Sequence, residues 1–209
     1  MHALIVTSHP SPQSLTHAVA HALAAGIQEG GHTTELADIA AEGFQPAFTS
    51  TDHGAHLVEQ EVPADVRREQ ARIDRASALV LVYPVYWWSF PGQLKGWIDR
   101  VFSNGWAYEE TAEGELLKRL GRLPVHLVGI GGGNAGTYER HGYGEAMKTQ
   151  IDHGIFDFCG APVLTSRLLL DVADPQAAAT HLETARVLGR GVFAGAHPPS
   201  AMAPAMIAA

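Results

Sequence analysis

Hydroxyl groups and prolines are concentrated in residues 7–16 (TSHPSPQSLT), directly after an apolar run and before a predicted helix. Hydroxyls and free backbone amides at the start of a helix form a site for anions such as phosphate. The glycine-rich turn of the dinucleotide fingerprint is missing here. We therefore expect a phosphate-binding loop of another type. The alternative is that Ser11 or Ser14 only caps the helix.

A second stretch, 84–92 (PVYWWSFPG), places four aromatic residues within five positions after another apolar run. A connecting loop normally avoids so many large apolar side chains unless it packs on something planar. The isoalloxazine ring of a flavin is such a group. The alternative is an aromatic plug that belongs to the hydrophobic core.

A third stretch, 129–138 (GIGGGNAGTY), is rich in glycine. Glycines let a backbone approach the edge of a flat ligand and offer it N–H donors. A glycine run by itself is also typical of a flexible turn. Three such loops at one edge of a sheet make a ligand site the stronger interpretation.

The elements that must position these loops follow from hydrophobic patterning. Continuous apolar runs predict buried parallel strands at Ala3–Thr7, Ala78–Tyr83 and Val125–Ile130, with weaker candidates at His32–Leu36 and Val163–Leu170. The expected helices are Gln13–Glu29, Ala64–Arg75, Gly92–Phe102, Gly144–Phe158 and Pro175–Val192, and Ser89 is a possible cap for the third. Strands that alternate with helices predict a doubly wound α/β sheet, whose ligands bind beyond the carboxyl ends of the strands.

We expect one domain over residues 1–195 and a Pro/Ala-rich tail over 196–209 that is mobile or lies on a partner subunit. Two stretches, 41–63 and 104–123, do not fit the alternation of strands and helices. We interpret both as excursions over the edge of the sheet that could shape a ligand site.

Composition excludes several classes of protein. The net charge of −8 argues against a nucleic-acid surface. The single cysteine, Cys159, rules out an internal disulfide, fits a reducing compartment such as the cytoplasm, and is expected to be a buried packing residue. No apolar stretch is long enough to predict membrane insertion. His17 and His21 share a helical face but have no third ligand, so no metal site is expected, and no nucleophile elbow supports a hydrolase.

The stretch YPVYWWSFPGQLKGWIDRVFSNGWAY (83–108) resembles the signature of the flavodoxin-like NAD(P)H:quinone oxidoreductases, the DT-diaphorase family. This family also contains bacterial quinone reductases and the ancillary flavoproteins of potassium efflux systems. Further matches are SHPSPQSLTHA (8–18), FQP (44–46), DVRREQ (65–70), GGGNAGTY (131–138) and FCG (158–160). The resemblance implies a flavodoxin-like fold, with a five-stranded parallel sheet of order 2-1-3-4-5 and helices on both faces.

The resemblance also implies which residues contact the flavin. Phosphate contacts are expected from His9, Ser14, Leu15 and Thr16. Contacts to the flavin ring are expected from Pro84, Val85, Tyr86, Trp87, Trp88, Ser89, Gly131, Gly132 and Gly133. Tyr138 matches the active-site tyrosine and also contacts the cofactor. Either Tyr143 or His141 would complete the proton relay, because the spacing after Tyr138 differs from that of the diaphorases.

The implied cofactor is FAD, with FMN as the alternative, and the implied electron donor is NADPH or NADH. The implied partners are a quinone or another small aromatic acceptor and a second copy of the chain, with the active site at the subunit interface. We predict ping-pong hydride transfer, in which donor and acceptor use the same face of the flavin in turn. Two alternatives are a regulatory subunit of a membrane transporter and a one-electron carrier. The additional segments 41–63 and 104–123 argue against the carrier.

Overall fold

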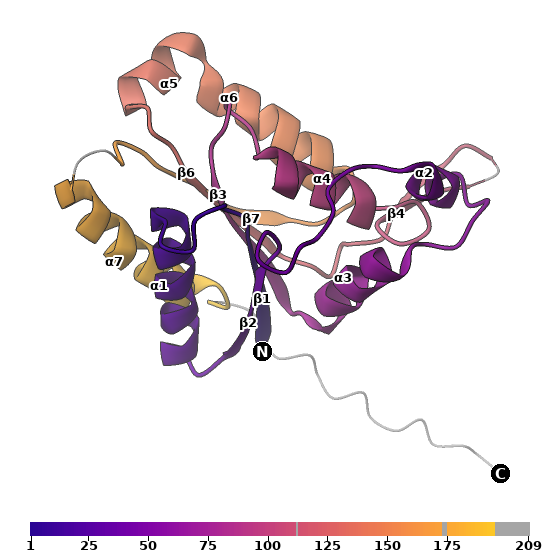
Figure 1. Ribbon diagram of the computed structural model, residues 1–209, viewed down its shortest axis with the longest axis horizontal. Helices are drawn as coiled ribbons and strands as arrows, with labels where there is room; N and C mark the ends of the chain where they lie inside the picture. The colour runs from indigo at the N-terminus through magenta and orange to yellow at the C-terminus, as the bar shows by residue number, and fades with distance from the viewer. Residues whose placement is uncertain (112, 173–174, 195–209) are drawn as a thin grey trace.

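The computed structural model describes residues 1–111, 113–172 and 175–194, which form a parallel sheet between two layers of helices (Figure 1). The strand order β2-β1-β3-β6-β7 is the predicted order 2-1-3-4-5, counted over these five strands alone. The strands are β1 (His2–Thr7), β2 (Thr33–Asp38), β3 (Ala78–Pro84), β6 (Val125–Ile130) and β7 (Val163–Leu169). The predicted fold class is therefore confirmed, whereas the tail predicted at 196–209 lies outside the described residues.

The alternation of side chains along β1 explains the two layers. Ala3 and Ile5 belong to one buried cluster, and Leu4 and Val6 belong to the other, because successive residues of a strand point to opposite faces. The first cluster is covered by α1 (Leu15–Glu29) and α7 (Pro175–Gly191). The second is covered by α3 (Ala64–Arg75), α4 (Gly92–Val101) and the π-helix η1 (Lys148–Asp157).

The start of one helix and the cap of another differ from the prediction. The helix α1 begins at Leu15 instead of Gln13, because the Ser14 side chain caps it by accepting a hydrogen bond from the His17 amide. The prediction that Ser89 caps α4 is wrong. The N-cap is Pro91, which has no side-chain cap, and the Ser89 hydroxyl donates to Gln150 Oε1 at 2.7 Å.

Three regions contain elements that the sequence patterns did not predict. The stretch 41–63 contains α2 (Ser50–His56), and 104–123 contains an antiparallel hairpin of β4 (Tyr108–Glu110) and β5 (Leu116–Lys118). Beyond the glycine loop, α5 (Ala135–His141) and α6 (Tyr143–Met147) precede η1. The expected helix 144–158 is therefore α6 continued as a wider π-helix, a form often found beside functional sites.

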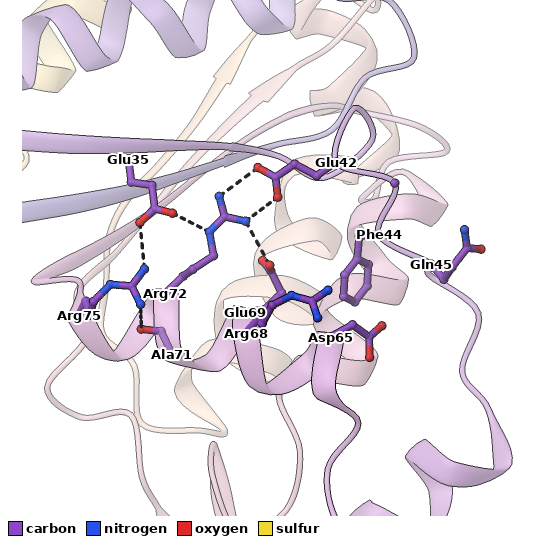
Figure 2. Close-up of a pocket in the computed structure, with 11 residues that line it drawn as sticks. Glu35, Glu42, Phe44, Gln45, Asp65, Arg68, Glu69, Ala71, Arg72 and Arg75 are labelled. Carbon is purple, nitrogen blue, oxygen red and sulfur yellow. Dashed lines mark hydrogen bonds and ion pairs between the residues drawn. The ribbon is translucent and has the colours of Figure 1, made fainter.

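A partly buried arginine, Arg72, joins α3 to the edge strand β2 and to the loop that follows it. Arg72 donates to Glu35 at 2.7 Å, to Glu42 at 2.6 Å and to Glu69 at 3.1 Å (Figure 2). These charged groups line a cavity of about 720 Å³ between β2, the loop after it and α3. Because Arg72 binds carboxylates from β2, from the loop after it and from α3 itself, the cluster holds three segments together.

Arg100 of α4, which is buried, holds the excursion 41–63 against the same layer. Its side chain is 5% exposed and donates to Asp52 at 3.0 Å, to Asp65 at 2.6 Å and to the Gln45 carbonyl at 2.8 Å. Burial by itself would raise the pKa of Asp65, but the hydrogen bonds and charge of Arg100 outweigh it and keep that pKa below its ordinary value.

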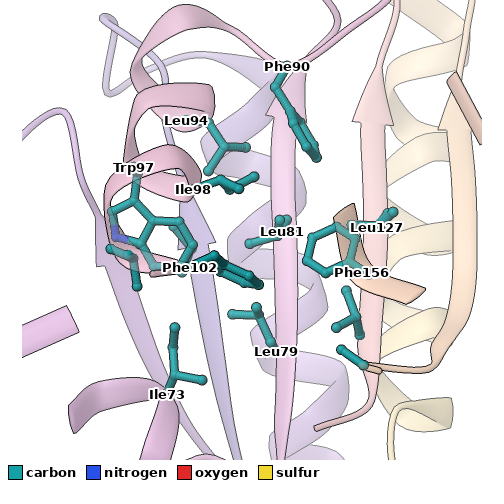
Figure 3. Packing of buried hydrophobic residues seen from close by; sticks show 14 of the residues in the cluster. Ile73, Leu79, Leu81, Phe90, Leu94, Trp97, Ile98, Phe102, Leu127 and Phe156 are labelled. Atoms are coloured by element: carbon teal, nitrogen blue, oxygen red, sulfur yellow. The ribbon is translucent and has the colours of Figure 1, made fainter. Parts of the chain in front are cut away.

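The core on this side is dominated by large aromatic residues. Trp97, Phe102 and Phe156 pack over Leu81 and Leu127 of the central strands (Figure 3). The Trp97 indole is fully buried, and its N–H donates to Glu69 Oε2 at 2.9 Å. The apolar face predicted for α4 is therefore confirmed. Cys159 is also buried in this cluster, where burial raises the pKa of its thiol to about 11.

On the opposite face, α1 and α7 approach so closely that glycine is required at the contact. A Cβ atom on Gly26 would lie 2.1 Å from the Arg186 carbonyl oxygen. A Cβ atom on Gly189 would lie 2.2 Å from the Leu23 carbonyl oxygen. Backbone atoms cannot move aside as a flexible side chain does. The two helices pack backbone to backbone at this point.

We predict that Gly189→Ala lowers the free energy of unfolding by about 1–3 kcal/mol, because the added methyl group must separate the two helices. Gly191→Ala is the matched control, two residues away in the same helix, where a Cβ meets nothing within 4 Å. Urea denaturation of both variants and the parent chain measures the difference. Equal stabilities would contradict the close helix contact.

Candidate functional site

Parallel pairing brings the three predicted loops to one edge of the sheet. Thr7 at the end of β1 pairs with Val82, and Pro84 at the end of β3 pairs with Ile130 at the end of β6. The loops that follow these strands therefore start side by side. Two of them enclose a cavity of about 390 Å³, here named the tryptophan cavity, which is lined by Val85, Tyr86, Trp87, Trp88, Gly132, Gly133, Thr137 and Tyr138.

The aromatic wall of the tryptophan cavity is a tight turn between β3 and α4. Tyr86 and Ser89 exchange backbone hydrogen bonds of 3.2 and 3.1 Å, and the two residues between them have positive φ angles, 50° at Trp87 and 56° at Trp88. Positive φ at both central positions is the pattern of a type I′ turn, which normally carries Asn-Gly. Two tryptophans in these positions store backbone strain, which is typical of functional sites.

The glycine loop forms the opposite wall and makes room for Tyr138. A Cβ on Gly131 would lie 2.8 Å from the Tyr138 hydroxyl, and one on Gly133 would lie 3.4 Å from its ring. A Cβ on Gly132 would meet nothing within 4 Å, so only that glycine opens freely to the cavity. The glycine run thus makes room for the Tyr138 ring, which the sequence patterns did not predict.

Tyr138 reaches this position because α5 starts at a capped residue. The Asn134 side chain accepts hydrogen bonds from the Thr137 amide at 2.9 Å and from the Thr137 hydroxyl at 3.1 Å, which fixes the first turn. The Tyr138 side chain is largely buried, and burial raises its pKa above the ordinary tyrosine value. At neutral pH the hydroxyl is therefore protonated and can donate a hydrogen bond.

The two candidates for a second relay residue stack behind the aromatic wall. The Tyr143 ring lies 3.8 Å from the Trp88 ring and 5.1 Å from the His141 ring, with interplanar angles of 26° and 23°. Neither residue belongs to the lining of the tryptophan cavity. Tyr143 supports Trp88 directly, and a proton-relay role for Tyr143 or His141 stays a prediction.

The predicted phosphate loop leads into α1. The His9 ring accepts a hydrogen bond from the Ser11 amide at 3.0 Å, which shapes the loop, and Ser14 is half-buried. Thr16 is buried and Leu15 packs against the core, so a ligand could meet only their amides. Within the described chain these two amides have no protein acceptor, as is usual in the first turn of a helix.

A second cavity of about 420 Å³, here named the His9 cavity, opens beside this loop. It is lined by His9, Pro10, Pro12, Asp38, Ala40, Ala41, Gly43, Phe44, Gln45, Pro46 and Gln93. The excursion 41–63 therefore shapes a cavity, and its role in a ligand site stays a prediction. The hairpin β4–β5 contributes no lining residue to either the His9 cavity or the tryptophan cavity.

These features fit a flavin nucleotide by their chemistry. Apolar aromatic side chains and an unobstructed glycine backbone suit a flat ring system, and free helix-start amides beside a serine hydroxyl suit its phosphate. The predicted contacts Val85, Tyr86, Trp87, Trp88, Gly132, Gly133 and Tyr138 come together around one cavity. Gly131 lies behind Tyr138, and the Ser89 hydroxyl is engaged with Gln150.

One arrangement was missed by sequence reasoning, which considered His17 only as a metal ligand. His17 Nε2 lies 2.7 Å from Asp38 Oδ2, and His17 Nδ1 lies 2.9 Å from Ser14 Oγ. His21, its partner in the rejected metal pair, is exposed. The spacing of Ser14 and His17 on one helical turn is visible in the sequence, but Asp38 comes from a neighbouring strand.

Comparison with known proteins agrees with the fold and site. A family model described as flavodoxin-like fold matches residues 1–188. A Haemophilus influenzae protein named as an uncharacterized NAD(P)H oxidoreductase is 30% identical over 173 residues, 82% of this chain and 85% of that protein. Human ribosyldihydronicotinamide dehydrogenase [quinone] is 27% identical over 187 residues, 79% of each chain.

Among solved structures, the NAD(P)H:quinone oxidoreductase from Methanothermobacter marburgensis superimposes with a TM-score of 0.85 at 29% identity, covering 92% of this chain and 98% of that one. Across the described helices, none is long and apolar enough to cross a membrane. The family match extends from β1 into α7 and includes every loop of the site described above. This protein belongs to the flavodoxin-like fold family.

Proposed function

We propose that this protein is a flavin-dependent NAD(P)H oxidoreductase that transfers two electrons to quinones or similar aromatic acceptors. The observation that carries the proposal is the tryptophan cavity, in which two strained tryptophans face an open glycine backbone and a protonated tyrosine. The relatives named as NAD(P)H and quinone oxidoreductases support the same activity.

FAD is the cofactor that we propose, with FMN as the alternative. The tryptophan cavity suits the flavin ring, and the start of α1 suits its phosphate. The His9 cavity next to that helix supplies further room, with Phe44 and several prolines as apolar surface for an adenosine group. Heat release of the bound flavin followed by chromatography distinguishes the two cofactors.

A bound flavin supplies the two-electron chemistry, accepting a hydride from a nicotinamide and passing one to the acceptor. The protein positions the reactants and stabilises charge. Trp87 and Trp88 confine planar partners near contact distance, and backbone amides of the glycine loop can face developing negative charge. Tyr138 donates a hydrogen bond to the acceptor oxygen as that oxygen gains negative charge. Its raised pKa keeps the phenol protonated, and therefore a donor, at neutral pH.

We further propose that the protein works as a cytoplasmic homodimer with the active site at the interface. The Trp87 side chain is 89% exposed at the rim of the cavity, which is unusual for so large an apolar group. A second subunit would cover it and complete the cavity wall. The single cysteine, which is buried, is compatible with a reducing compartment.

Anaerobic stopped-flow measurements test the activity. We expect NADPH, NADH or dihydronicotinamide riboside to bleach the flavin-loaded protein rapidly, and benzoquinone to restore its colour without a detectable radical product. Loss of bleaching with all three donors would reject the oxidoreductase and leave an electron carrier or a regulatory binder. Bleaching followed by recovery in two one-electron steps would favour the carrier.

We predict that Tyr138→Phe slows acceptor reduction by roughly 100-fold while flavin binding is retained, because only the hydrogen-bond donor is removed. Separate half-reactions in the stopped-flow instrument locate the defect. Tyr108→Phe, in the hairpin that lines neither cavity, is the control for loss of a tyrosine hydroxyl away from the site and should react as the parent does. If acceptor reduction by Tyr138→Phe equals that of the parent, Tyr138 takes no part in the reaction.

The strain in the aromatic turn gives a stability prediction. In the flavin-free protein Trp87→Gly should be more stable than Trp87→Ala by up to about 1 kcal/mol, because only glycine adopts positive φ without cost. Both variants lose the same ring and should lose turnover. Urea denaturation provides the comparison. An alanine variant at least as stable as the glycine variant would show that the turn is not left-handed.

A further inference from the structure

A hydrogen-bonded chain of three side chains lies under the start of α1. Asp38 Oδ2 lies 2.7 Å from His17 Nε2, His17 Nδ1 lies 2.9 Å from Ser14 Oγ, and Ser14 Oγ also accepts the His17 amide at 3.3 Å. The His17 side chain is only 6% exposed and that of Asp38 is 21% exposed. Ser14, at the other end of the chain, is half-buried and is the N-cap of α1, the helix start that we propose for the flavin phosphate.

The protonation state of His17 decides what Ser14 can offer a ligand. The Asp38 carboxylate accepts a hydrogen bond, so Nε2 carries a hydrogen in either state. In neutral His17 the Nδ1 atom has a lone pair, so Ser14 must donate its only hydroxyl hydrogen to the imidazole. The serine then presents a lone pair outward, which repels a phosphate oxygen.

In protonated His17 the direction of that bond reverses. Nδ1–H donates to Ser14 Oγ, which then accepts from both Nδ1 and the His17 amide. Both lone pairs of the hydroxyl oxygen are occupied, and its hydrogen is free to point at an anion. Charge-assisted hydrogen bonds to phosphate are among the stronger ones in proteins.

The charges around the site also favour a protonated His17 when a phosphate is bound. Asp38 lines the His9 cavity, and the described residues that line this cavity include no lysine or arginine. A flavin phosphate at the start of α1, with its adenosine group in this cavity, would have the Asp38 carboxylate nearby and no permanent cation among these lining residues to offset it. The imidazolium of His17 would neutralise Asp38 next to the site.

We propose that His17, held by Asp38, is a positioning residue that takes up a proton when the flavin phosphate binds and thereby turns the Ser14 hydroxyl toward the phosphate. The inference rests on the proposed flavin site. Its consequence is that flavin affinity rises as pH falls, because the bound state holds more protons than the free state.

The titratable groups around His17 are few. Asp38 on β2 accepts its Nε2–H, and the His9 ring of the β1–α1 loop lies 6.3 Å away, edge to face. On its own helix, His21 lies one turn further on and is exposed. His9 is therefore the other group that could titrate when a phosphate binds.

Isothermal titration calorimetry with FAD tests the proposal, since the diphosphate of FAD does not titrate near neutral pH and any proton uptake belongs to the protein. Binding measured at about pH 8 in two buffers with different heats of ionisation gives the number of protons taken up. We expect an uptake of up to one proton, and a Kd that rises by up to about tenfold per pH unit on the alkaline side.

Three variants assign the proton. His17→Asn places a non-titrating amide near the position of Nδ1 and should abolish the uptake, so that the Kd becomes independent of pH. His21→Asn, on the same helix, and His9→Asn should keep the uptake. Riboflavin, which lacks the phosphate, should bind the parent protein without proton uptake.

The outcomes separate this inference from the proposed function. FAD binding by the parent protein with a Kd that does not change with pH overturns the role of His17 and leaves the flavin site intact, even if His17→Asn does not fold. Loss of the uptake in His9→Asn with retention in His17→Asn also overturns it. Failure of the parent protein to bind either FAD or FMN rejects the flavin site itself.

Discussion

The parallel pairing of β3 with β1 on one side and β6 on the other is the constraint on which the site depends. All hydrogen-bonded neighbours in a parallel ladder run in the same direction, so their carboxyl ends share one edge. The hydroxyl-rich loop, the aromatic turn and the glycine loop are separated by tens of residues in sequence and start side by side. A shift in the pairing of β3 would dismantle the tryptophan cavity without changing a single local motif.

Two arginines that are buried or partly buried, Arg100 and Arg72, fix the loop after β2 against α3 and α4. Arg100 bonds the Gln45 carbonyl as well as two aspartates, and Arg72 joins β2, the following loop and α3. Such pairs add little net stability, because each charge must leave water, but an unpaired partner is costly. These two arginines consequently favour one position of the loop that forms the wall of the His9 cavity.

Strain and close packing occur in different parts of the molecule. At the close contact of α1 with α7, two glycines leave room for the backbones and neither has a positive φ angle. At the aromatic turn, in contrast, Trp87 and Trp88 occupy positive-φ positions that glycine would adopt without strain. A cost of this kind persists when the surrounding structure holds the turn in place. The Tyr143 ring, stacked on Trp88, provides part of that support.

The sequence patterns by themselves determined the doubly wound α/β sheet and the three loops of the site, because continuous apolar runs and 3.6-residue periodicity are local signals of burial. The order of the strands followed from the resemblance of residues 83–108 to a known family, and not from these patterns. The patterns also singled out the paired tryptophans by residue type, and the resemblance singled out Tyr138. Only the tertiary structure decided that Gly131 makes room for the Tyr138 hydroxyl, that Tyr143 stacks behind Trp88, and that Asp38 reaches His17. These contacts join residues from different strands and helices, and their geometry depends on packing between elements, which no local pattern of residues encodes.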